Sequence, residues 1–252
     1  MTREPLLESL LSWTVSTPLM DLEDPYLRMR VQSLTQLRAS PRTKALAVYA
    51  YVKRLPLSKS VKRRSRTAAE VLRAGTGDAP DKATLLVAML RQLGMPARLH
   101  VVALRAPIVR GLGVAILRPA RPIVEVWMDE RWVATDTYIF DAPYLSAARQ
   151  RLKAEQAEYG YGIHVEGAMA WDGFHSAYVS GRPPEHDPMV AKVLGHFHDP
   201  GAFLAAQSRF GGRLWRARLL QWNLLAPWLQ RTIHAVRDNR GLPRDGGGAG
   251  PD

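Results

Sequence analysis

The sequence predicts an α+β protein in which a long buried helix packs against an antiparallel sheet. Helical apolar periodicity runs as far as Leu93, and the stripe within residues 79–93 is too broad for a surface helix. After Pro96 the pattern changes to β-rich runs separated by a tight turn. A helical first part followed by consecutive strands is typical of the α+β class.

Length and composition indicate an ordinary globular protein. The 252 residues are 46% hydrophobic and 23% charged, enough for one well-buried core or at most two small ones. No apolar run approaches the roughly 18 residues of a membrane span, so no transmembrane segment is expected. Because Glu4 and Glu8 interrupt the leucines of MTREPLLESLLSW, we interpret this start as a structural helix and not as a secretion signal. The absence of cysteine excludes thiol catalysis by this chain and fits a cytoplasmic location.

Capping residues delimit the predicted helices. After a helical segment over residues 1–40, a helix from Pro41 to Pro56 places its apolar residues on one face. Thr67 and Glu70 have capping-box spacing, and Gly75 ends that short helix. The buried helix follows, with Asp78 as N-cap, Asp81 in the first turn, and Gly94 and Pro96 at its exit.

The strands are predicted over residues 97–106, 122–128 and 131–140. Asp129–Glu130 is interpreted as a two-residue hairpin loop, which places Arg121 opposite Tyr138. Residues 143–160 are expected to form a further helix, 160–203 ordered loops, and 211–240 a Trp-rich helix that is kinked or split at Pro227. The predicted organisation is an N-terminal helical segment, a core, a helical and His-rich extension packed on that core, and a disordered tail, at residues 1–40, 41–145, 146–240 and 241–252.

Three segments in order resemble the transglutaminase-like superfamily. They are TAAEVLRAGTGDAPDKATLLVAMLRQLGMPAR (67–98), RPIVEVWMDERWV (121–133) and ATDTY (134–138), within a matched core of roughly residues 40 to 140. The resemblance implies a papain/transglutaminase-like fold. It also implies acyl transfer by a Cys-His-Asp triad, in which a thiolate at a helix N-terminus attacks a carbonyl and a histidine carries the proton.

Two of the three triad positions carry other residues. The Cys position corresponds to Ala79 and the His position to Arg121, whereas Asp136 is kept. Arginine cannot act as a general base, because its pKa stays above about 12. Acyl transfer through a thioester is therefore excluded, and no catalytic residue is assigned. An engineered replacement of Cys by Ala79 alone would have left the histidine in place.

The hairpin register suggests a replacement for the proton shuttle. Asp136 is the diagonal neighbour of Arg121 on one sheet face, so we predict an Arg121–Asp136 ion pair, ideally bidentate. Glu125 shares that face and is interpreted as a second acceptor for Arg121 or as an exposed strand residue. Thr76 is interpreted as a turn residue. The predicted binding cleft comprises Asp78, Ala79, Asp81, Arg121, Glu125 and Asp136.

The histidines leave a metal site open as an alternative to the expected absence of cofactors. His196 and His198 could place both rings on one side of a strand, and His186 lies nearby in the sequence. The remaining spacings match no metal motif, and histidines in polar loops commonly cap or contact water.

A net charge of +12 raises the possibility of anionic partners. The basic run from Lys53 to Arg66 either binds an anionic membrane or nucleic acid, or forms a solvated loop. The Trp-rich C-terminal helix packs either on its own domain or on a membrane.

Three functions remain open. The first is a catalytically degenerate protein whose former cleft binds a peptide, an acyl carrier or a partner protein. The second is an enzyme with non-thiol, acid- or metal-based chemistry on amides or esters in that cleft. The third is a basic adaptor at a membrane or nucleic acid.

Overall fold

The computed structural model describes residues 8–62, 64–113, 119–208 and 224–239. The predicted tail at 241–252, together with Trp215 and Trp222, lies outside these ranges. The helices and strands, in order, are η1 Ser12–Thr14, α2 Pro25–Thr35, α3 Pro41–Arg54, α4 Ala68–Ala74, α5 Ala79–Gln92, β1 Ala97–Leu104, η2 Ala106–Val109, β2 Ala120–Met128, β3 Arg131–Thr135, η3 Thr137–Ile139, α6 Ala142–Ala154, β4 Tyr159–Gly160, β5 Ile163–His164, β6 Val190–Phe197 and α8 Ala226–Arg237. Among the described residues, no helix is both long enough and apolar enough to cross a membrane.

The predicted helix caps are confirmed. Thr67 and Glu70 form the capping box of α4, which ends at Gly75 with φ 64°. Asp78 and Asp81 form the capping box of α5, so two orphan amides at its start are satisfied. Every α5 residue from Asp81 to Arg91 is buried, which makes this the central helix of the core.

The main sheet is antiparallel and has the strand order β3-β2-β1-β6. The predicted hairpin register is confirmed, since Met128 pairs with Arg131 and Val124 with Thr135. Asp129 and Glu130 have φ values of 50° and 59°, the left-handed conformation that a two-residue hairpin loop requires. The predicted α+β class, with a buried helix on an antiparallel sheet, is therefore confirmed.

A substitution at Glu130 tests the left-handed backbone conformation of the β2–β3 hairpin loop. Replacing Glu130 by Gly should raise the free energy of unfolding by about 0.5–1 kcal/mol, because glycine adopts positive φ without a Cβ penalty. Chemical denaturation of both proteins measures the change. Glu130→Ala keeps the penalty and should give no such gain, and a destabilised Gly variant would contradict the prediction.

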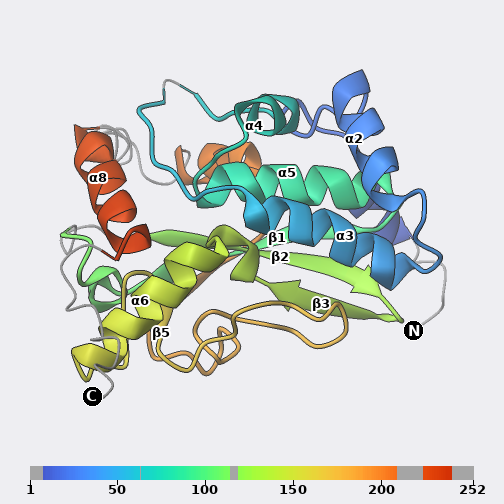
Figure 1. Ribbon diagram of the computed structural model, residues 1–252. Helices are drawn as coiled ribbons and strands as arrows, with labels where there is room; N and C mark the ends of the chain where they lie inside the picture. The colour runs from blue at the N-terminus through green and yellow to red at the C-terminus, as the bar shows by residue number, and fades with distance from the viewer. Residues whose placement is uncertain (1–7, 63, 114–118, 209–223, 240–252) are drawn as a thin grey trace, which may run out of the picture.

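The two faces of the sheet have different coverings. In Figure 1, α2, α3, α4 and α5 lie over one face, and α6 and the loops around β5 lie on the other side. Strand alternation directs Leu99 and Val124 toward the helices, and directs His100 and Arg121 to the opposite face. There the segment from Tyr178 to Val190 covers part of the sheet.

One expectation for the C-terminal half needs correction. Residues 160–203 are not loops throughout, because Val190–Phe197 forms β6 and pairs with β1. Pro227 lies in the first turn of α8, where proline costs no hydrogen bond, and the preceding residues 209–223 of the predicted helix lie outside the described ranges. In the described part of this region, α8 buries Leu229, Ile233 and Val236 and packs on α6.

Candidate functional site

The start of α5 carries a network of ion pairs around Ala79. Lys62 Nζ lies 2.7 Å from Asp78 Oδ1 and 2.6 Å from Asp81 Oδ2, and Lys59 Nζ lies 2.8 Å from Asp78 Oδ2. Arg66 approaches Asp81 at 3.7 Å. Both carboxylates are buried, and the cations of the basic segment balance their negative charge at the start of α5.

In this network the pKa values of Asp78 and Asp81 are shifted in opposite directions. Burial raises the pKa of Asp78, but Lys59 and Lys62 more than offset it, so the pKa lies below its ordinary value. Burial and the charge of Asp78 raise the pKa of Asp81 against the opposing effect of Lys62. Asp78 is therefore the charged N-cap of α5.

The basic segment is not simply a solvated loop. Lys59 and Lys62 are only 20% and 15% exposed, and Lys53 donates to the carbonyls of Thr137 and Phe140. Arg64, which is exposed, pairs with Glu70. Much of the charge in this segment is thus used within the fold.

The predicted Arg121–Asp136 ion pair is confirmed, although its geometry differs from the expected fork. Arg121 Nη1 donates to Asp136 Oδ2 at 3.2 Å, while Nη2 donates to the carbonyl of Gly162 at 2.5 Å. The other carboxylate oxygen of Asp136 accepts from the amide of Val179 at 2.7 Å. A bidentate pair is therefore wrong, because the second arm of the guanidinium is used by a backbone carbonyl.

Asp136 does not lie in the strand that the sequence predicted for it. The β2–β3 ladder ends at Thr135, so Arg121 has no strand partner at Tyr138. The chain turns into η3, and the hydroxyl of Tyr138 donates to the carbonyl of Pro122. Asp136 consequently reaches Arg121 from the turn.

Burial dominates the electrostatics of this pair. It raises the pKa of Asp136, and the guanidinium of Arg121 opposes that shift. The side chains of Arg121 and Asp136 are 6% and 1% exposed. A small cavity beside the pair is lined by residues of β1, β2 and the covering segment, including Val102, Ile123, Tyr178 and Asp187.

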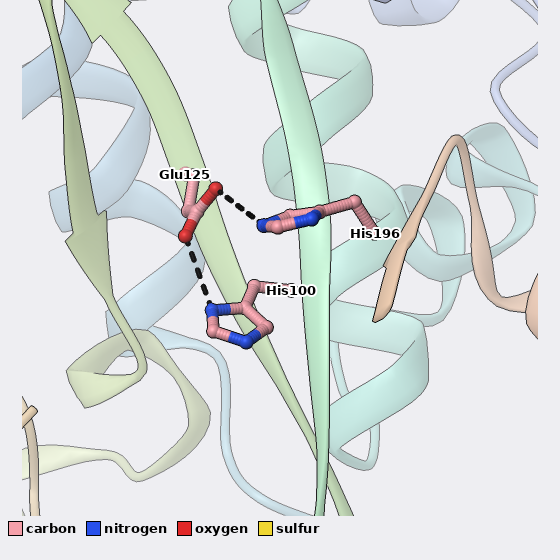
Figure 2. Close-up of side chains that lie close together, drawn as sticks. All are labelled: His100, Glu125 and His196. Carbon is pink, nitrogen blue, oxygen red and sulfur yellow. Dashed lines mark hydrogen bonds and ion pairs between the residues drawn. The ribbon is translucent and has the colours of Figure 1, made fainter. Parts of the chain in front are cut away.

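Glu125 has neither of its expected roles, since it is buried and pairs with residues other than Arg121. Its Oε1 lies 3.2 Å from His100 Nδ1, and its Oε2 lies 3.3 Å from His196 Nε2 and 2.7 Å from Arg98 Nε. Figure 2 shows both imidazole rings directed at this carboxylate. The strand alternation could have placed Glu125 beside Arg98 and His100, but it could not have supplied His196.

The histidine group also differs from the expected set. Among the described residues, a cluster with metal-ligating atoms within 4.8 Å of one another contains His100, Glu125 and His196. His198 instead contacts the ring of Trp13, and His186 is not part of the cluster. His100 lies in a strand of mainly apolar residues, and no sequence spacing marks it as part of this cluster.

The predicted cleft residues thus belong to three sets of contacts. Asp78 and Asp81 bind the lysines at the start of α5, beside Ala79; Arg121 and Asp136 bind one another; Glu125 binds the histidines. Whether any of these sets binds a ligand stays a prediction.

Comparisons with known proteins agree with the resemblance seen in the sequence. A model of the core of the transglutaminase-like superfamily matches residues 28–137, whereas a search of curated proteins gave no match. Among solved structures, a "Putative Cysteine Protease" from Cytophaga hutchinsonii is 14% identical, with a TM-score of 0.44 over 55% of this chain and 46% of that one. That likeness spans less than half of the other protein and carries no further argument. Residues 28–137 are therefore similar to a transglutaminase-like core, and Ala79, Arg121 and Asp136 all lie within them.

Proposed function

We propose that this chain is a catalytically degenerate transglutaminase-like protein that uses its former acyl-transfer cleft to bind an acidic peptide, acyl carrier or partner protein. The observation that carries the proposal is the set of contacts that Arg121 makes. At the position of the family's histidine, this guanidinium is buried and held between Asp136 and the carbonyl of Gly162.

Thiol acyl transfer needs a nucleophile and a group that accepts its proton, and neither group is present at these two positions. Ala79 offers no nucleophile at the start of α5, and Arg121 cannot accept a proton at physiological pH. The retained acid, Asp136, is occupied by Arg121 and the amide of Val179. The contacts that would orient a catalytic imidazole therefore stabilise a fixed ion pair.

The charge of the surface near α5 favours an acidic partner. A hollow lined by Val61, Lys62, Arg64, Arg66 and Glu70 adjoins the ion-pair network through Lys62 and Arg66. Together with a net charge of +12, these cations would attract a carboxylate- or phosphate-bearing partner and speed its association.

An activity assay tests the catalytic part of the proposal. The purified protein is expected to incorporate no fluorescent amine into a glutamine peptide and to hydrolyse no activated ester above the rate of buffer. Turnover that disappears on Asp136→Asn substitution would contradict the proposal and favour an enzyme with non-thiol chemistry.

A binding assay tests the other part. Labelled acidic peptides should bind with an affinity that falls as salt rises, and Arg64→Glu should weaken that binding. Arg38→Glu makes the same charge change at an exposed site outside the hollow and should have a smaller effect. Equal effects of the two variants would reduce the binding to net charge alone.

A further inference from the structure

Three strands bring His100, Glu125 and His196 together on the sheet face opposite α5. His100 in β1 and His196 in β6 are direct cross-strand partners. Glu125 in β2 is paired with Arg98, two residues before His100 on the same face of β1. This arrangement depends on β6, which lies outside the transglutaminase-like core at residues 28–137.

The distances within the cluster suit a small metal ion. A tetrahedral ion with ligand bonds of about 2.0–2.1 Å separates its ligand atoms by about 3.3–3.4 Å. Glu125 Oε1 lies 3.2 Å from His100 Nδ1, and Glu125 Oε2 lies 3.3 Å from His196 Nε2, so each imidazole matches this separation to a different oxygen, and binding through one oxygen requires a side chain to rotate. The ligand atoms of all three residues lie within 4.8 Å of one another, so rotation of side chains alone can close the set.

A further feature favours an ion over a simple hydrogen-bonded cluster. Arg98 donates to Glu125 at 2.7 Å and stacks on Trp132 at 4.0 Å, as an outer-shell residue that orients a ligating carboxylate would do.

We propose that His100, Glu125 and His196 bind a divalent transition-metal ion, with Zn²⁺ as the best match to two imidazoles and one carboxylate. His196 is 37% exposed, so the ion has a route to the site and a fourth position open to water or a ligand. The ion would tie β6 to β1 and β2, and would thereby fasten the C-terminal extension to the transglutaminase-like core. This site is independent of the proposed binding function near α5.

Metal titration of the untagged full chain, stripped with chelator, tests the proposal. Calorimetry should show one Zn²⁺ per chain, and Zn²⁺ should raise the thermal unfolding temperature by an amount that grows with the logarithm of its concentration divided by its Kd. Co²⁺ should give the intense visible absorption of a tetrahedral site. Glu125→Gln and His196→Gln should each weaken Zn²⁺ binding at least about tenfold.

His175→Gln provides the matched control. His175 lies 2.9 Å from Asp172 in an exposed histidine–carboxylate pair, so its removal leaves the three-residue cluster intact. This variant should bind Zn²⁺ as the unaltered protein does. If Glu125→Gln fails to fold, the half-exposed His196→Gln decides the result. The proposal is overturned if the unaltered protein binds no stoichiometric ion, or if His196→Gln binds Zn²⁺ as tightly as His175→Gln does.

Discussion

Replacing Arg121 by Met is expected to lower the free energy of unfolding by about 3–5 kcal/mol, the usual result of removing one partner of a buried ion pair. The variant leaves Asp136, which is 1% exposed, without its counter-charge and leaves the carbonyl of Gly162 without its side-chain donor. Guanidinium denaturation at pH 7 measures the loss. The loss should shrink in acid, because burial already raises the pKa of Asp136 and a protonated carboxyl needs no counter-charge.

A surface pair of the same chemistry provides the control. Arg110 lies 2.7 Å from Glu155, but their side chains are 50% and 35% exposed. Arg110→Met should therefore cost only about 0–1 kcal/mol. The double variant Arg121→Met/Asp136→Leu should recover part of the loss, because no buried charge remains. If Arg121→Met costs no more than Arg110→Met, then the buried pair does not stabilise the fold as described.

The second large effect is a rise in stability with pH caused by Lys82. This side chain is fully buried in α5, and its ammonium donates to the carbonyls of Lys53, Leu55 and Ile139. Burial lowers the pKa of Lys82 to about 7. Between that value and the unfolded value of about 10.4, the unfolded chain binds more protons than the folded one. The free energy of unfolding should therefore rise with pH, by up to about 1.4 kcal/mol per pH unit.

Comparison with a Lys82→Met variant isolates this effect. The variant leaves three carbonyls without a donor, but that cost does not depend on pH. The stability difference between the unaltered protein and the variant should therefore change by about 2–3 kcal/mol from pH 7 to pH 9 in favour of the unaltered protein. Lys53, whose pKa burial lowers to about 8, adds a rise in both proteins. Exposed Lys153→Met is the control, and a difference that is constant with pH for Lys82→Met would refute the prediction.

Features that depend on residues close in the sequence were predictable. The caps of α4 and α5 each join residues three positions apart, and the hairpin register follows from a two-residue loop. These interactions form within one turn of chain, so spacing alone specifies them. The assignment of Ala79 and Arg121 to the family's Cys and His positions rests on the resemblance of three segments and stays a prediction.

Contacts between distant segments were not predictable in the same way. Arg121 was expected to use both arms on Asp136, but the loop at Gly162 competes for one of them. Glu125 was assigned to Arg121 because both lie on one strand face, whereas Arg98, His100 and His196 bind it from two other strands.

The difference has one physical cause. Capping, turn conformation and apolar periodicity are properties of a short stretch of backbone, and they predicted the helix on the sheet. The edge strand β6 has weak periodicity, since it contains Lys192, Gly195 and His196 and none of its residues is buried. β6 binds to β1 through backbone hydrogen bonds at an open sheet edge. Any extended segment can make such bonds, so no local pattern specifies this pairing. Only the folded sheet therefore brings His196 next to His100 and Glu125, where the proposed metal site forms.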